Sequence, residues 1–219
     1  NAPHFNLGIG WRFVLQSVQW AMDLVGRATY GDNFEGHFER FELNEVYQFG
    51  VHHGVSLVLL LSVFGGRKIW GFDSFEGLPA EADKVDYYND WEQGRWNSGD
   101  TREALSAMLG GPRHVKFIKG FYSDSLTSTL AADRMMQPAS FIDVDCDLYI
   151  STIQAMDFMF KYSLARVGTM IGYDDWWALP CNQNSSDVYN GGEGRAHLEI
   201  AKKYGVRFLC IAGPCVYPR

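Results

Sequence analysis

The chain has 219 residues, 47% of them hydrophobic, which is enough to bury the core of a single domain. Its 19 basic and 26 acidic side chains leave a net charge of −7, which disfavours nucleic acid as a partner and favours a small substrate or a cationic cofactor. Four irregularly spaced cysteines indicate neither a zinc cluster nor a disulfide framework, and no apolar run is long enough to cross a membrane, so we expect a cytoplasmic protein.

The predicted elements fall into two parts. Apolar residues at helical spacing over 11–27 predict a helix that packs on the domain or covers a partner subunit, and a homo-oligomer is expected. Residues 1–44 are interpreted as an N-terminal helical extension or lid. From residue 45 to residue 219, short apolar strands alternate with helical runs, a pattern typical of a parallel sheet with crossover helices.

The expected strands cover residues 45–49, 68–72, 115–119, 141–145, 167–173, 206–212 and 215–217, the last two as an antiparallel hairpin. The expected helices cover residues 55–64, 101–109, 125–132, 151–164 and 193–204. The helix at 101–109 follows Asp100-Thr-Arg-Glu103, which has the spacing of a capping box. The insertion at 74–99 contains Tyr87, Tyr88, Trp91 and Trp96 and is predicted to be an ordered loop over a site.

Ligands of open α/β sheets bind beyond the carboxyl ends of the strands, so the residues at the strand exits are the first candidates for ligand binding and catalysis. After the first strand, Gly50 and Gly54 allow a tight turn and a close backbone approach to a ligand at the next helix. Asp73 follows the second strand about twenty residues later, a spacing suited to a carboxylate that binds a ribose. After the third strand, Tyr122 and Asp124 could hold an adenine ring.

Acidic residues gather after the fourth and fifth strands. Asp143, Asp145 and Asp147 alternate, so a continuing strand would crowd them on one face, although a solvated acidic loop is equally compatible with these residues alone. Asp174 and Asp175 follow the fifth strand. Because adjacent strands lie about 4.8 Å apart, carboxylates from both exits could bind one Mg²⁺ ion, which could lower the pKa of a substrate hydroxyl.

Other side chains have more than one interpretation. His52, His53 and His197 could each act as a general base, and His197 is the one retained as a candidate. Trp176 and Trp177 could form a wall for a sugar or aromatic acceptor, or could simply pack in the core or between subunits.

Three segments resemble the signature segments of the macrocin O-methyltransferase family, a branch of the class I S-adenosylmethionine-dependent methyltransferases. They are G-F-D-S-F-E-G-L-P at 71–79, D-V-D-C-D-L-Y-I-S-T at 143–152 and G-Y-D-D-W at 172–176. The resemblance implies a Rossmann-like, doubly wound, mostly parallel sheet of seven strands with an antiparallel last strand. It further implies S-adenosylmethionine as methyl donor and Mg²⁺, or another divalent cation, assisting the methylation of a small-molecule hydroxyl, often on a sugar of a natural product.

The resemblance also implies roles for individual residues. Gly50 and Gly54 match the glycine turn that faces the methionine part of the cofactor, and Asp73 matches the acid that binds its ribose. The metal ligands are predicted to be Asp145, Asp174 and Asp175, with Asp145 also the candidate base or orienting group for the hydroxyl. The full set of predicted cofactor-binding residues is Phe49, Gly50, Gly54, Asp73, Ser74, Tyr122, Asp124 and Asp143.

Two departures from the family pattern are visible. Gln48 stands where relatives commonly carry an acid, which would weaken hydrogen bonding to the cofactor's amino group. Asp143, where relatives often carry another residue, is expected to face the cofactor, and Asp147 is expected beyond the strand as a helix cap or supporting acid.

Two other functions stay open at this point. Asp143-Val-Asp145 and Asp145-Cys-Asp147 both fit the D-x-D pattern of metal-dependent glycosyltransferases, although the glycine turn argues against that class. A non-catalytic S-adenosylmethionine-binding protein is the second alternative, and Gln48 is its single hint.

Overall fold

The computed structural model describes residues 45–64, 66–81, 91–110, 113–176 and 191–208. All of these except Phe208 belong to one compact unit, Leu43–Arg207. The predicted helix at 11–27, Trp177 and most of the predicted C-terminal hairpin lie outside the described residues. Residues 206–208, where the first hairpin strand was expected to begin, are described and are not in a strand.

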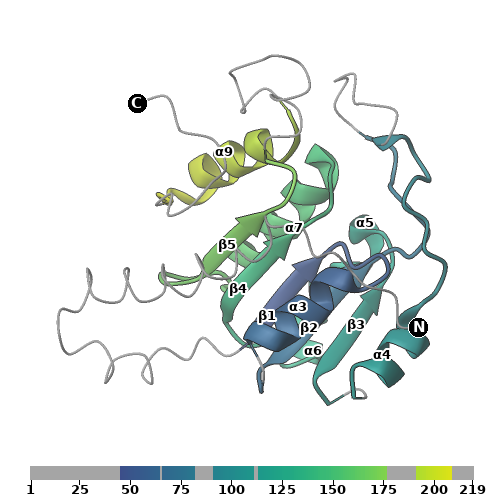
Figure 1. The fold of residues 1–219 in the computed structure, drawn as a ribbon. Helices are drawn as coiled ribbons and strands as arrows, with labels where there is room; N and C mark the ends of the chain where they lie inside the picture. The colour runs from purple at the N-terminus through teal and green to yellow at the C-terminus, as the bar shows by residue number, and fades with distance from the viewer. Residues whose placement is uncertain (1–44, 65, 82–90, 111–112, 177–190, 209–219) are drawn as a thin grey trace. The chain divides into compact units, whose positions relative to one another are not determined.

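The described part of the chain contains a five-stranded sheet in the order β3-β2-β1-β4-β5 (Figure 1). All of its pairs are parallel. The strand order reverses between β1 and β4, which is where ligands bind in open α/β sheets. The strands are β1 (Glu45–Phe49), β2 (Lys68–Asp73), β3 (Val115–Lys119), β4 (Ala139–Val144) and β5 (Met170–Tyr173).

The helices alternate with the strands, as the sequence pattern predicts. They are α3 (Val55–Val63), α4 (Arg102–Met108), α5 (Tyr122–Ser125), α6 (Leu130–Asp133), α7 (Tyr149–Lys161) and α9 (Gly192–Tyr204). Within the described residues no helix is both long and apolar enough to cross a bilayer.

Three local predictions are wrong. The helix expected over 125–132 is two short helices, and the segment between them contains Thr127, Ser128 and Thr129, residue types with low helix propensity. The fifth strand begins at Met170 rather than residue 167, because Arg166 and Thr169 bond each other across a turn. The N-cap of α4 is Thr101 rather than Asp100, whose carboxylate accepts the Arg102 backbone N–H at 3.4 Å and its side chain at 2.7 Å.

The central strands β1 and β4 are buried along their whole length, since elements cover both faces of the sheet. On one face Gln48 bonds Ser56 of α3, and on the other Phe72 contacts Phe158 of α7. Gln48 also donates to the Asp143 carboxylate on the paired strand, at 3.2 Å. Polar side chains therefore occupy the sheet interior on the α3 side, directly below the strand exits.

Glu45 organises the opposite end of the sheet. Its carboxyl group is 3% exposed and accepts hydrogen bonds from Lys68 Nζ at 2.6 Å, Trp70 Nε1 at 2.7 Å and the Tyr47 hydroxyl at 2.9 Å. The backbone N–H of Gln137 is a fourth donor, also at 2.9 Å. One carboxylate thus joins β1, β2 and the segment that leads into β4.

We predict that Glu45→Ala lowers the free energy of unfolding by about 3 kcal/mol or more, because several buried donors lose their acceptor at about 1–3 kcal/mol each. Urea denaturation of the purified protein measures the change. The exposed Glu103 on α4 gives the control, Glu103→Ala, which should change stability by less than about 0.5 kcal/mol. Equal stability of the two variants would contradict the role of Glu45.

Candidate active site

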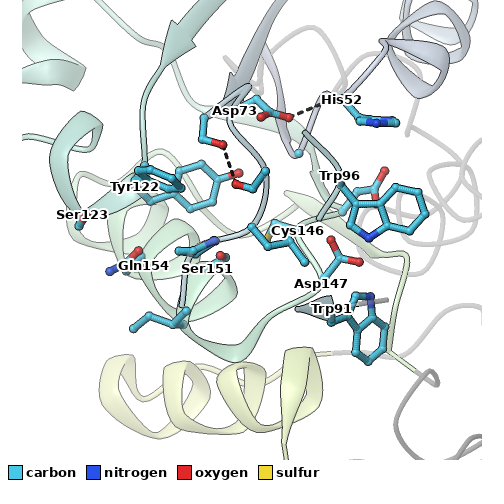
Figure 2. A pocket seen from close by; sticks show the side chains of 18 of the residues that line it. His52, Asp73, Trp91, Trp96, Tyr122, Ser123, Cys146, Asp147, Ser151 and Gln154 are labelled. Atoms are coloured by element: carbon cyan, nitrogen blue, oxygen red, sulfur yellow. Dashed lines mark hydrogen bonds between the residues drawn. The ribbon is translucent and has the colours of Figure 1, made fainter. Parts of the chain in front are cut away.

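A cavity of about 680 Å³ opens at the carboxyl ends of the strands (Figure 2). Seven of the predicted site residues line it: Gly50, Asp73, Ser74, Tyr122, Asp145, Asp174 and Asp175. The other predicted site residues, Phe49, Gly54, Asp124 and Asp143, do not line it. The cavity therefore brings together residues from the exits of β1, β2, β4 and β5 and from α5.

Asp73 joins the exits of β1 and β2. One carboxylate oxygen accepts the backbone N–H groups of Val51 at 2.7 Å and His52 at 2.8 Å, and the other accepts that of Phe75 at 2.6 Å. The carboxylate thus fixes the turn after β1 against the end of β2. Since an ionised carboxylate has about four acceptor sites, Asp73 retains room for one further donor on the cavity side.

Packing within the protein requires glycine at both positions of the turn after β1. Gly50 has φ +93°, and a Cβ there would lie 1.6 Å from the carbonyl oxygen of Asp145. Gly54 has φ +75°, and a Cβ there would lie 2.5 Å from Leu105 Cδ2. Gly50 therefore lets the turn approach the exit of β4, and Gly54 lets it approach α4. Of the two glycines, only Gly50 borders the cavity.

Tyr122 and Phe49 contact each other, but only Tyr122 lines the cavity. Tyr122 lines the cavity, and its hydroxyl donates to the Phe72 carbonyl oxygen at 3.3 Å. Burial raises the pKa of this hydroxyl well above its usual value, so it stays neutral. Phe49 is fully buried and meets the edge of Tyr122, with ring centroids 5.6 Å apart. Asp124 is exposed on α5.

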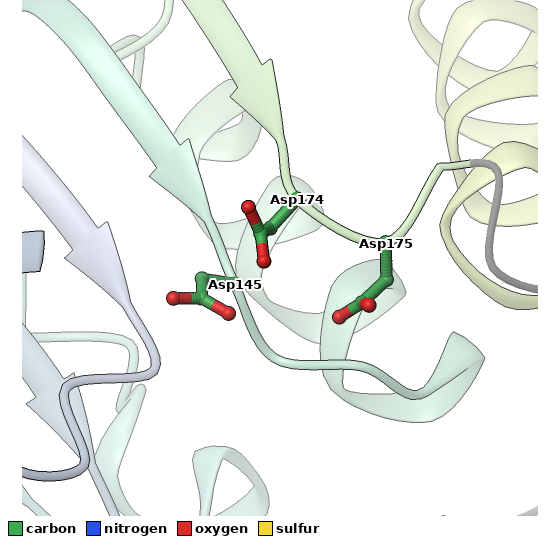
Figure 3. A group of neighbouring side chains, drawn as sticks. All are labelled: Asp145, Asp174 and Asp175. Atoms are coloured by element: carbon green, nitrogen blue, oxygen red, sulfur yellow. The ribbon is translucent and has the colours of Figure 1, made fainter. Parts of the chain in front are cut away.

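Asp145, Asp174 and Asp175 form a three-carboxylate cluster (Figure 3). Each offers one oxygen, and these oxygens lie within 4.8 Å of one another. Two backbone bonds hold the cluster, from Asp145 N to the Phe49 oxygen at 2.9 Å and from Asp174 N to the Val144 oxygen at 3.0 Å. The predicted association of these three acids is thus present in the fold.

The electrostatics of the cluster are unfavourable without a positive partner. Burial, followed by the neighbouring carboxylates, raises the pKa of Asp145 well above its usual range and that of Asp175 to about 8. Burial also raises the pKa of Asp174. Oxygen ligands at this spacing suit a hard divalent cation such as Mg²⁺, which would remove the mutual repulsion. The donor set therefore fits the expected metal.

The alternating acids do not share one strand face, because β4 ends at Val144. Asp143 is buried in the strand, and burial raises its pKa to about 7. Asp147 has φ +60° and lines the cavity, and burial raises its pKa to about 6. Asp147 does not cap α7, whose N-cap is Leu148. Trp91 and Asp175 instead bond the Asp147 side chain.

Of the remaining candidates, His52 lines the cavity, whereas His53, His197 and Trp176 do not. His197 lies 3.1 Å from the Tyr173 hydroxyl through Nδ1, and burial lowers its pKa to about 4. Trp176 is buried against both rings, with centroids 5.1 Å from Tyr173 and 5.0 Å from His197. Neither His197 nor Trp176 lines the cavity, so this structure places both in the packing behind β5.

The insertion contributes Trp91 and Trp96 to the cavity, in agreement with its prediction as a loop over a site. Figure 2 shows both rings on the side of the cavity where Asp147 lies, across from Tyr122. Backbone bonds from Leu78 N to the Arg95 oxygen and from Gly94 N to the Leu78 oxygen, at 2.8 and 2.9 Å, hold this segment in place.

Sequence reasoning missed Glu193, which is 1% exposed and accepts the backbone N–H of Asp175 at 3.1 Å. Burial and the clustered acids raise the pKa of Glu193 well above its usual value. Its only sequence signal is an acid in the first turn of a helix, which is ordinary at that position.

Comparisons with known proteins identify a family and two similar folds. A family model described as Macrocin-O-methyltransferase (TylF) matches residues 27–200. The crystal structure of CalS11, a calicheamicin methyltransferase, aligns with a TM-score of 0.59 and 17% identity over 90% of this chain and 72% of that one. The structure of the O-methyltransferase NovP aligns with a TM-score of 0.53 and 20% identity, over 86% and 73%. The search of curated proteins gave no match.

The two structural alignments show a class I methyltransferase fold, which confirms the predicted fold class, while the sixth and seventh expected strands lie largely outside the described residues. The family model covers far more than half of the chain and includes all three signature segments. The chain therefore belongs to the macrocin O-methyltransferase family and is an S-adenosylmethionine-dependent O-methyltransferase.

Proposed function

We propose that this enzyme methylates a hydroxyl on a sugar of a natural product and that a divalent cation, Mg²⁺ in the first instance, assists the transfer. The observation that carries the proposal is the three-carboxylate cluster, which borders the same cavity as Asp73 and Tyr122. One cavity thus offers a cofactor end at β1 and β2 and a cation end at β4 and β5.

At the cofactor end, the chain's own groups would position S-adenosylmethionine. Asp73 would accept a ribose hydroxyl at its remaining acceptor site, and Ser74 and Tyr122, which line the cavity, would border the adenosyl group. The turn at Gly50 would face the methionine part. When bound, S-adenosylmethionine supplies an electrophilic methyl group on a sulfonium, and the protein's task is to align it with the acceptor oxygen.

At the cation end, Asp145, Asp174 and Asp175 would hold the metal. When bound, a divalent cation supplies positive charge beside the acceptor hydroxyl and lowers its pKa. Asp145 is the first candidate to accept or orient the hydroxyl proton. Asp147 is a second candidate, because it lines the same cavity and stands outside the cluster of three.

The sugar assignment rests on the family resemblance and on the aromatic walls. Trp91 and Trp96 line the same cavity, with the Trp96 ring centroid 5.7 Å from that of His52, and indole faces pack well on the apolar faces of sugar rings. Family membership gives the glycosyltransferase alternative no support, which leaves it only the D-x-D spacing. Turnover with any acceptor would exclude the non-catalytic alternative.

The first test removes a metal ligand. Asp174→Ala or Asp145→Ala should lower Mg²⁺-dependent turnover at least about 100-fold, because the remaining two carboxylates hold the cation poorly. Calorimetry should find S-adenosylhomocysteine affinity nearly unchanged. Asp133→Ala, at an exposed position on α6, is the control and should behave as wild type. Full activity of either cluster variant in chelator would remove the metal from the proposal.

The second test addresses Asp73. Asp73→Asn should weaken S-adenosylhomocysteine binding at least about tenfold and also lower the melting temperature, since an amide cannot accept from three backbone N–H groups and a ribose hydroxyl together. Calorimetry and thermal melting measure the two effects. Unchanged affinity with a lowered melting temperature would restrict Asp73 to a structural role.

The third test uses pH. Asp147, Asp143 and Asp175 have pKa values raised to about 6, 7 and 8, so between about pH 4 and pH 8 the folded chain binds more protons than the unfolded chain. Stability without metal should therefore fall as pH rises from 6 to 8. His197, with its pKa lowered to about 4, acts oppositely and destabilises the fold only as pH falls below about 6.5.

Thermal melting in chelator across pH 6–8 measures this trend, and Mg²⁺ should raise the melting temperature more at pH 8 than at pH 6. Asp175→Asn should flatten the chelator curve. A melting temperature that rises with pH over this interval would contradict the electrostatic account of the cluster.

A further inference from the structure

Glu193 is a buried acid held at the exit of β5. It lies in the first turn of α9 and is 1% exposed, and its Oε2 accepts the backbone N–H of Asp175 at 3.1 Å. Its Oε1 has no hydrogen-bond partner among the residues that the structure describes. A buried carboxylate oxygen without a partner is costly, by about 1–3 kcal/mol or more for a charged group.

The surroundings of Glu193 are strongly negative. The acids that act on its charge are, in decreasing order, Asp175, Asp145, Asp174 and Asp147, which include the whole three-carboxylate cluster. Placing one more acid beside four others raises the free energy of the fold unless a positive charge arrives. A cation bound by the cluster would be attracted by Glu193 as well.

We propose that Glu193 is a fourth acidic residue of the cation site, in which Oε2 holds Asp175 by its backbone and Oε1 is reserved for the cation or its hydration shell. The inference rests on the proposed function, since it assumes that the cluster binds a divalent cation. Mg²⁺ and Mn²⁺ both suit such a site, because they accept carboxylate oxygens and retain several waters.

A purely structural role makes a different prediction. An acid in the first helical turn is stabilised by the helix dipole, and an acceptor at this position also fixes the Asp175 backbone. Glutamine preserves the side-chain length and the acceptor for Asp175 N–H and removes only the charge. Glu193→Gln therefore separates anchoring of the backbone from attraction of the cation.

The experiment is calorimetric titration of Mn²⁺ alone into the full chain, without cofactor or acceptor. Glu193→Gln should raise the Mn²⁺ dissociation constant about tenfold, the effect typical of groups that support metal ligands. The metal-free melting temperature of this variant should equal or exceed that of wild type, because glutamine is neutral at every pH and no carboxyl group then has to be buried beside the other acids. Glu199→Gln, at a half-exposed position on the same helix, is the matched control and should bind Mn²⁺ as wild type does.

The outcomes separate the two proposals. Mn²⁺ binding that Asp174→Ala abolishes and Glu193→Gln leaves unchanged would overturn the role of Glu193 while keeping the cation site. No Mn²⁺ binding by wild type would overturn both. A lowered metal-free melting temperature together with unchanged Mn²⁺ affinity would assign Glu193 to structure alone. Weaker binding in Glu193→Gln, with Glu199→Gln unaffected, is the expected result.

Discussion

The contact between the exits of β1 and β4 is the constraint on which the rest of the site depends. Gly50 lies so close to the Asp145 carbonyl oxygen that a single Cβ would overlap it at 1.6 Å. Because the strand order reverses between these two strands, this contact lies at the centre of the cavity edge. On one side the turn continues to the Val51 and His52 backbone N–H groups that Asp73 holds, and on the other Asp145 leads to the cluster.

Buried acids have opposite electrostatic surroundings at the two ends of the sheet. At the amino end, four donors surround the Glu45 carboxylate, so its burial is compensated within the protein. At the carboxyl end, Asp145, Asp175 and Glu193 are buried close to other acids, and burial, followed by these neighbours, raises their pKa values. A satisfied buried acid contributes to folding, whereas an unsatisfied group of them is a reason to look for a ligand. This contrast distinguishes the structural acid from the candidate site in a chain that has many acids.

Part of the cavity wall is built by the described residues of the insertion between β2 and α4. Gly77 is required there, since a Cβ would lie 2.5 Å from the carbonyl oxygens of Gly94 and Arg95. The close backbone pairing brings Trp91 and Trp96 to the cavity, and Trp91 bonds Asp147. This interaction connects the aromatic insertion to an acid beside the proposed cation site.

The sequence by itself determined the alternation of strands and helices, the acids at the exits of β4 and β5, and the family to which the chain belongs. These features are local: apolar periodicity specifies each element, and the signature segments are contiguous. Only the tertiary structure decided that β4 ends before Asp145, that Asp147 turns into the cavity at φ +60°, and that His197 and Trp176 pack behind β5. It also brought Glu193 to Asp175 from a helix that begins beyond the loop after β5. Contacts between residues far apart in the sequence depend on the tertiary fold, and the periodicity within a segment carries no information about them.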